Sequence, residues 1–308
     1  MPDAGDVVVT RGHPPRPGSS RRRLATASLV LLGILWGSTF FSIKRIVAVI
    51  PVTDFLAVRF LISTVVLVAV FHRSLTMSRR TWLHGIILGA LWAVAQLLQT
   101  AGLAHTSASL SGFVTGLYVV FTPVLGLVVF RAKVNRWAWV AVGLSAIGLA
   151  LLTLRPQPGT LVGFGELLTI GCAVVYALHI VIMGHWSTPA EAAGLTVAQA
   201  ISMTVVFFIA AIPGGIQLPT SGVNWAWMIY LAVICGALTL LIQTWAQSHV
   251  EPSTAAVIMC SEPLWATFFA IIFGGEHLTW IFAVGACAML VAMYLVVRPP
   301  GRTDLEKH

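Results

Sequence analysis

Apolar residues run almost without interruption from residue 24 to residue 298. They make up 58% of the sequence, whereas Asp, Glu, Lys and Arg together supply only 9%. Soluble globular proteins contain about 25% charged residues, and disordered chains are poor in apolar residues. The sequence therefore excludes a soluble domain and a disordered chain, and it predicts an integral membrane protein.

The apolar runs predict helices rather than strands. Strands of a membrane barrel alternate between apolar and polar residues, but these runs are apolar on every face. A helix needs about 20 residues to cross the hydrocarbon core, which leaves room for ten helices with short connections. We expect an all-α protein with transmembrane helices at residues 24–44, 53–71, 82–104, 108–130, 136–154, 163–184, 193–212, 223–243, 252–273 and 279–297.

Lys and Arg predict how the chain crosses the membrane. Most of these 18 residues lie in the polar head, the polar tail and two connections that share one side of a ten-helix arrangement. Lys44, Arg45 and Arg155 lie on the other side, and Arg59 lies within a helix. Because positive residues stay in the cytoplasm, we expect both termini there, with the protein in the plasma (inner) membrane. We assign these charges to topology and to weak contact with membrane lipid, and not to nucleic-acid binding.

An internal repeat divides the chain into halves. Short matches recur at a nearly constant separation: Gln99, Thr100 and His105 match Gln243, Thr244 and His249 after 144 residues, and Trp137 matches Trp280 after 143. The repeat unit then holds five helices, and a second copy of an odd unit enters the membrane upside down, as in many secondary transporters. We therefore predict two inverted five-helix repeats at 24–155 and 163–298, between a basic cytoplasmic head at 1–23 and a cytoplasmic tail at 299–308.

Several short motifs follow one another along nearly the whole chain: Trp36-Gly37-Ser38-Thr39-Phe40 with Lys44, Arg59-Phe60, Pro123, Glu262-Pro263 and Gly274-Gly275-Glu276. In their order and spacing the chain resembles the EamA-type members of the drug/metabolite transporter superfamily. This resemblance implies a ten-helix bundle with a central substrate cavity, which often exports amino acids or other small metabolites. At one point the chain departs from the pattern. The first repeat has Ala132-Lys133 where the second has Gly275-Glu276, so a role for a matched pair of acids is not expected.

Glu262 is the leading candidate for a functional residue. A charge at the bilayer centre costs at least about 2.5–3.5 kcal/mol, and Glu262 lies near the middle of its expected helix. Pro263 follows it, and we expect this proline to kink the helix and free a backbone carbonyl. An acid beside a helix break is the setting of substrate and ion sites in transporters. Two interpretations remain open: a carboxylate that carries a proton or binds a substrate amine, and a neutral acid that clasps neighbouring helices.

Arg59 and Glu166 are the other two charges expected within helices. Both lie toward the outer leaflet, so a pairing between them across the two repeats is possible, and Asp54 is a rival partner for Arg59. We expect a structural role for both, with anchoring of a substrate carboxylate as the alternative for Arg59.

Polar and aromatic side chains within the helices complete the set of candidates. For substrate binding or coupling we consider Trp36, Trp92, Gln96, Gln99, Tyr118, Tyr176, His179, Gln243 and Trp265. Packing is the alternative for the tryptophans and for His179. The repeated amides Gln99 and Gln243 either shape gates at opposite mouths of one pathway or form hydrogen bonds between packed helices.

These features favour a secondary transporter that moves a small organic solute, an amino acid or related metabolite, most simply outward. There is no GxxxxGK[ST] loop for ATP, so the driving force is a proton gradient or the gradient of the solute itself. A membrane-embedded enzyme lacks its HExxH or GxSxG motif, and a channel or receptor-like bundle explains the repeat less well. The four cysteines have no CxxC spacing, so we expect no metal and no cofactor. A homodimer is left open.

Overall fold

The computed structural model describes residues 19–131, 136–153, 163–250, 255, 258–259 and 261–297, and all regular structure in this part of the chain is helical. The longer elements are α1 (Ser19–Ile46), α2 (Val52–Val70), α3 (Arg79–Ala104), α4 (Ala108–Gly116), α5 (Tyr118–Phe130), α6 (Arg136–Thr153), α7 (Phe164–Trp186), α8 (Ala192–Ala211), α9 (Gly222–Ile229), η3 (Tyr230–Leu238), α10 (Thr239–Gln247), α12 (Glu262–Ile272) and α13 (Trp280–Val297). The turns η1 (His72–Thr76) and η2 (Ile212–Gly214) are short 3₁₀ helices.

Seven stretches of the described chain are long and apolar enough to cross a membrane. They are Arg23–Ile46, Val52–Val70, Arg79–Ala104, Ala108–Phe130, Phe164–Trp186, Ala192–Gly214 and Gly222–Gln247. Three shorter apolar helices cover Trp139–Gly148, Glu262–Ile272 and Trp280–Ala292. The all-helical membrane class predicted from the sequence is confirmed in this part of the chain, whereas the count of ten crossings and the inversion of the halves stay predictions.

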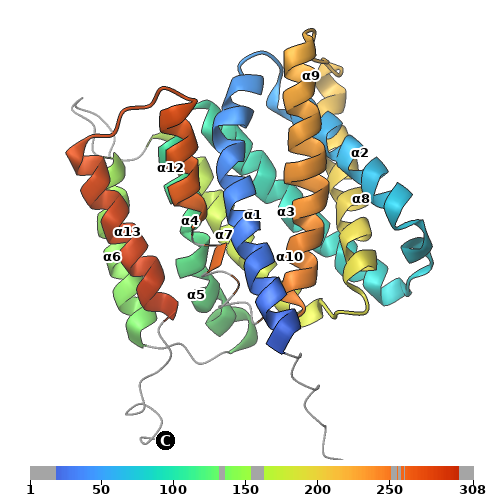
Figure 1. The fold of residues 1–308 in the computed structure, drawn as a ribbon, viewed down its shortest axis with the longest axis horizontal. Helices are drawn as coiled ribbons and strands as arrows, with labels where there is room; N and C mark the ends of the chain where they lie inside the picture. The colour runs from blue at the N-terminus through green and yellow to red at the C-terminus, as the bar shows by residue number, and fades with distance from the viewer. Residues whose placement is uncertain are drawn as a thin grey trace, which may run out of the picture.

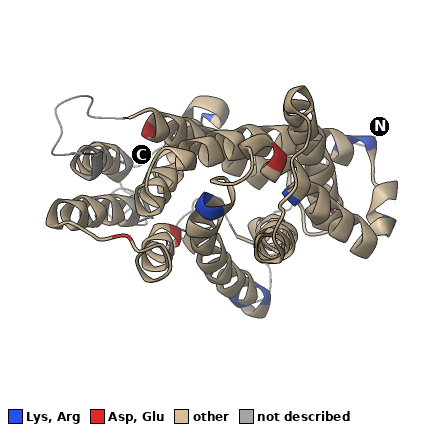
Figure 2. Cartoon of the chain, turned by 90° about the horizontal axis from the view of Figure 1, so that it is seen from above, with Lys and Arg blue, Asp and Glu red and all other residues tan. Residues whose placement is uncertain are grey.

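The helices form one bundle in which distant parts of the chain lie side by side (Figure 1). At one end α13 packs along α6, and at the other end α8 packs against both α2 and α3. Helix α1 lies between these ends, where it contacts α12 and α10. Lys, Arg, Asp and Glu are sparse along the helices (Figure 2), as a lipid-facing bundle requires.

Glycine allows α1 to approach α12 closely. A methyl group at Gly37 would overlap Cβ of Trp265 and would lie 2.8 Å from the amide nitrogen of Ala266. Gly85 on α3 plays the same part opposite Ala198 on α8. Helices in a membrane associate largely through such close packing, because lipid is as apolar as the side chains. The small residues therefore determine where the walls of the bundle interior stand.

Two of the helices expected from the sequence are interrupted. The stretch expected at 108–130 is divided into α4 and α5 at Leu117. In the stretch expected at 252–273, α12 begins only at Glu262, with Ser261 as its N-cap and Pro263 in its first turn. A proline in a first turn removes no helical hydrogen bond, because the first amides have no partner within the helix. The helix break expected beside Glu262 is present, but Pro263 lies in the first turn of α12 and does not kink a continuous helix.

A third departure is a π-helical segment. The helix expected at 223–243 is built from α9, the π helix η3 and α10. Hydrogen bonds of a π helix skip one more residue than those of an α helix, and such segments often occur at functional sites. Side chains supply additional bonds to its carbonyls: Ser63 Oγ donates to Ala232 O over 2.7 Å, and Thr239 Oγ1 donates to Cys235 O over 2.8 Å. Helix α2 is thereby tied to the π segment.

Candidate functional site

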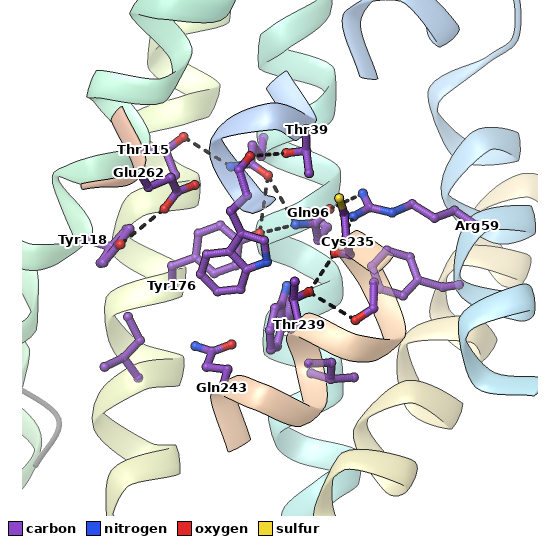
Figure 3. Close-up of a pocket in the computed structure, with 17 residues that line it drawn as sticks. Thr39, Arg59, Gln96, Thr115, Tyr118, Tyr176, Cys235, Thr239, Gln243 and Glu262 are labelled. Atoms are coloured by element: carbon purple, nitrogen blue, oxygen red, sulfur yellow. Dashed lines mark hydrogen bonds between the residues drawn. The ribbon is translucent and has the colours of Figure 1, made fainter. Parts of the chain in front are cut away.

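A cavity lies in the interior of the bundle (Figure 3). Its wall combines aromatic and aliphatic side chains with polar and charged ones. Nine elements contribute to it, from both halves of the sequence. The lining residues are Trp36, Thr39, Arg59, Phe60, Trp92, Gln96, Gln99, Thr115, Tyr118, Tyr176, Ile180, Cys235, Gly236, Thr239, Leu240, Gln243 and Glu262.

Most of the residues singled out in the sequence meet in this cavity. The candidates that line it are Trp36, Arg59, Trp92, Gln96, Gln99, Tyr118, Tyr176, Gln243 and Glu262, and those outside its lining are Glu166, His179, Pro263 and Trp265. Sequence reasoning missed the small residues Gly236 and Thr239. They lie seven and four positions before Gln243, a helical spacing that marks one face, and this spacing is the signal that could have identified them.

Glu262 and Tyr118 meet at the cavity wall. Glu262 is buried, and Tyr118 Oη donates a hydrogen bond to Glu262 Oε2 over 3.3 Å. Each residue begins a helix, Tyr118 that of α5 and Glu262 that of α12. The two residues are 144 positions apart, which is also the separation that relates the two copies of the repeat.

Arg59 is buried and is held by acceptors other than carboxylates. Its Nε donates to Leu231 O over 3.1 Å and its Nη2 donates to Cys235 O over 3.2 Å, both in η3. Its Nη1 donates to Gln96 Oε1 over 3.4 Å. Figure 3 shows the guanidinium group beside Cys235, at the edge of the cavity. The π segment thus supplies the carbonyls that make a buried guanidinium tolerable in the bundle.

The two carboxylates considered as partners for Arg59 have other hydrogen bonds. Asp54 Oδ2 accepts from the backbone amide of Gln217 over 3.0 Å. Glu166 Oε1 accepts from Thr106 Oγ1 over 2.8 Å. In the described structure Arg59 therefore bonds to backbone carbonyls of η3, and the ion pair considered between Arg59 and Glu166 is not formed.

The turn between α3 and α4 is held by charged side chains from distant elements. Lys44 Nζ on α1 donates to Thr106 O over 2.7 Å. Glu276, in the connection between α12 and α13, accepts from the backbone amides of Ala108 over 2.7 Å and Ser109 over 3.2 Å. A carboxylate at this position satisfies amides that have no partner within α4 and complements the helix dipole. These two motif residues thus have structural contacts outside the lining of the cavity.

One wall of the cavity holds a network of hydrogen-bonded amides and hydroxyls. Gln96 Nε2 donates to Tyr176 Oη and to Gln99 Oε1, the latter over 3.2 Å. Tyr176 Oη also donates to Gln99 Oε1 over 3.4 Å. Gln99 Nε2 then donates to Thr115 Oγ1 over 3.3 Å. We call these four residues the bonded wall, since their polar atoms satisfy one another across α3, α4 and α7.

Two polar groups of the same cavity lack such partners. Within the described structure, neither Nε1 of Trp92 nor Oε1 of Gln243 has a hydrogen-bond partner. Both side chains are nearly inaccessible, with exposed fractions of 5% for Trp92 and 2% for Gln243. A buried polar group without a partner costs about 1–3 kcal/mol. We call Trp92 and Gln243 the open pair. Gln99 and Gln243 both line this cavity, and a role for them as gates stays a prediction.

His179 and Trp265 lie behind the wall. His179 Nε2 shares a hydrogen bond with Gln199 Oε1 at 2.9 Å, and its ring centre is 4.9 Å from that of Trp92. Trp265 packs edge-on against Phe268, with ring centres 5.9 Å apart. These residues support the cavity from outside its lining.

A buried cavity with a mainly apolar wall and a few convergent polar groups has the form of a small-molecule site. Ionisable residues within a membrane bundle mark the pathways of substrates or ions. Here Glu262 and Arg59 both reach such a cavity in the interior of the bundle. The fold and the site together define the class of membrane transporters.

The chain belongs to the EamA-like transporter family, within the drug/metabolite transporter superfamily, and it matches the family model over residues 24–154 and again over residues 163–298. Two similar proteins from Archaeoglobus fulgidus are named uncharacterized transporters. One is 26% identical over 90% of this chain and 86% of its own length, and the other is 26% identical over 87% and 95%.

A third relative, from Streptantibioticus cattleyicolor, is named a probable terminal-alkyne amino-acid exporter. It is 26% identical over 32% of this chain and 33% of its own length. Among solved structures, one crystal structure with 15% sequence identity covers 90% of this chain and 96% of its own, with a TM-score of 0.67. That structure shares the fold.

Proposed function

We propose that the protein is a secondary transporter that exports a small organic solute, an amino acid or a related metabolite, across the plasma membrane. The cavity carries this proposal, because it is buried in the bundle and is lined by residues of both matched stretches. The relative named an amino-acid exporter supports the solute class and the outward direction. Transport would proceed by alternating access around this cavity.

Ten crossings in two inverted halves, with both termini in the cytoplasm, are part of the proposal. The double match to the family model supports two related halves. Helices that the repeat relates pack against each other in three cases, α2 with α8, α4 with α12 and α6 with α13. Such pairings are expected when a pseudo-twofold axis passes through the bundle.

The charges of the cavity fit the two charges of an amino acid. Arg59 has five N–H donors, of which Leu231, Cys235 and Gln96 each accept one, so that donors remain for a carboxylate. Glu262 would bind the ammonium group or exchange a proton with the pathway. The aromatic side chains Trp36 and Tyr176 would then contact the apolar part of the solute.

The test is transport by the purified protein in liposomes. Vesicles are loaded with a panel of amino acids and related metabolites, and efflux is followed with and without an imposed pH gradient. We expect saturable efflux of at least one solute, driven by the proton gradient, and we expect Glu262→Gln to abolish the driven component while exchange of the solute persists. Glu191→Gln, which removes an exposed acid outside the cavity, is the matched control and should retain driven efflux.

Other outcomes would contradict the proposal. Flux that never saturates indicates a channel, and a chemically altered solute indicates an enzyme. Labelling of single cysteines that places Arg23 and Arg302 on different faces would overturn the topology.

A further inference from the structure

The open pair differs from the other unpartnered groups because both of its members line the cavity. Buried side-chain atoms without a partner occur at several places in the described part of the bundle, including Ser111, Ser145, Gln247 and Thr267. Within that set, Trp92 Nε1 and Gln243 Oε1 are the ones that belong to lining residues of the cavity. A group that is unsatisfied in a wall can be satisfied by what enters the cavity.

The two members of the open pair line one cavity from different helices, Trp92 from α3 and Gln243 from α10. The ring of Trp92 is 4.9 Å from that of His179, which shares a hydrogen bond with Gln199. Gln199 Nε2 in turn donates to Thr244 Oγ1 over 3.4 Å, and Thr244 is the residue next to Gln243. Figure 3 shows no hydrogen bond from Gln243 to the other residues drawn, and it shows Gln243 apart from the bonded residues Tyr118 and Glu262. Gln243 is thus separate from the acid of the cavity.

The chemistry of the pair indicates what it can recognise. The indole N–H of Trp92 is a donor only, whereas the side-chain amide of Gln243 offers both an acceptor oxygen and donor hydrogens. Because Arg59 and Glu262 are available for the charged groups of an amino acid, the pair is left for a neutral group that both donates and accepts. A carboxamide or a hydroxyl has this character, whereas a methyl or methylene group leaves both wall groups unsatisfied.

We infer that Trp92 and Gln243 select solutes that carry a neutral hydrogen-bonding group, a carboxamide or a hydroxyl, in addition to the charges bound at Arg59 and Glu262. The inference rests on the proposed function and names the solute class of the same cavity. A site built to hydrogen-bond a substrate group discriminates strongly against the analogue that lacks it, because the buried polar groups are then left unpaired. The remainder of the cavity polar network has no free amide for this purpose, since Gln96 and Gln99 bond within the wall.

The experiment compares solutes of equal shape in the liposome assay. L-asparagine is measured against L-leucine, and L-threonine against L-valine, each pair differing in a hydrogen-bonding group at nearly constant volume. We expect wild-type protein to prefer the polar member of at least one pair by about tenfold or more in kcat/KM. We expect Gln243→Leu and Trp92→Phe each to reduce that preference about tenfold, mainly by weakening transport of the polar member.

The matched control is Gln247→Leu. Gln247 lies one turn further along α10, its amide is also buried without a partner, and it does not line the cavity. This variant should keep the wild-type preference. Thermal unfolding of each purified variant in detergent shows that it is folded, and Gln243→Leu should unfold no earlier than wild type because no hydrogen bond is lost.

Three results would overturn the inference while leaving the proposed function intact. They are saturable transport without preference within either solute pair, an unchanged preference in both cavity variants, and the same loss of preference in Gln247→Leu. The absence of saturable transport for every solute of the wider panel would instead overturn the proposed function itself.

Discussion

The bonded wall and the open pair are two regions of one cavity. Because the sequence repeats, these two regions are expected to be alike. Gln99 and Gln243 occupy matching positions, and both line the cavity. Gln99 has hydrogen bonds with Gln96, Tyr176 and Thr115, whereas the side chain of Gln243 has none among the described residues. Two copies of one sequence pattern thus differ in their surroundings: the amide of Gln99 is bonded to neighbouring side chains, and the amide of Gln243 is not.

The difference has a structural source in the neighbouring helices. Gln96 precedes Gln99 by three residues and bonds to it, but the corresponding position before Gln243 is Leu240, and the adjacent Thr239 bonds to the backbone at Cys235. Because η3 is π-helical, its carbonyls accept bonds from Thr239 and also from Arg59. The local hydroxyl is therefore occupied, and Gln243 is left to face the cavity.

The largest expected effect comes from removing Arg59, which donates a hydrogen bond to the bonded wall at Gln96. Arg59→Ala deletes three hydrogen bonds from a guanidinium to buried acceptors, and each such bond to a charged group contributes about 1.5–3 kcal/mol. We expect destabilisation of more than about 3 kcal/mol, measured as a lower thermal midpoint in detergent, and much less folded protein. Arg59→Lys keeps the charge but not the planar guanidinium, so its thermal midpoint should lie between those of Arg59→Ala and wild type. A normal midpoint in Arg59→Ala would show that the bonds to η3 are dispensable.

A pair of matched substitutions compares the two regions directly. Gln99→Leu leaves polar partners in the bonded wall unsatisfied and should cost about 1–3 kcal/mol. Gln243→Leu removes an acceptor that already lacks a partner, so its free energy of unfolding should stay within about 0.5 kcal/mol of wild type or rise. Chemical or thermal unfolding of both variants under one condition measures the difference. Equal losses of stability would break the comparison.

The smallest expected effect is at Glu191, outside the cavity, and concerns the loss of stability at acid pH. The hydrogen bonds that Thr81 and Thr188 donate to Glu191 lower the pKa of that carboxyl group. A lowered pKa in the folded state means that this contribution to stability is present above about pH 4.3 and is lost as the pH falls through the folded value. Because Glu191 is exposed, the contribution should stay below about 1 kcal/mol.

Glu191→Gln should remove this small acid-side loss of stability. The thermal midpoint is compared between pH 6 and pH 4 in the variant and in wild type. An identical decrease in both proteins would assign the acid sensitivity to other groups, and that sensitivity would then have to be subtracted before the two regions of the cavity are compared.

Much of the candidate site was predictable from the sequence because polar residues are rare in an apolar chain. Glu262, Arg59, Gln99 and Gln243 are prominent for that reason, and all four line the cavity. His179 was equally prominent but lies behind the wall, bonded to Gln199. Burial in the bundle depends on which face of a helix meets which neighbour, and runs that are apolar on every face carry little information about this choice.

The sequence by itself determined the class of the protein and the approximate places of its helices. A chain with so few charges must satisfy its backbone within helices when its surroundings are lipid, whatever the helices then pack against. Only the tertiary structure decided where those helices break, at Leu117, before Glu262 and through η3. It also decided which of two repeated amides is bonded, because hydrogen-bond partners such as Tyr176 and Thr115 reach Gln99 from other helices.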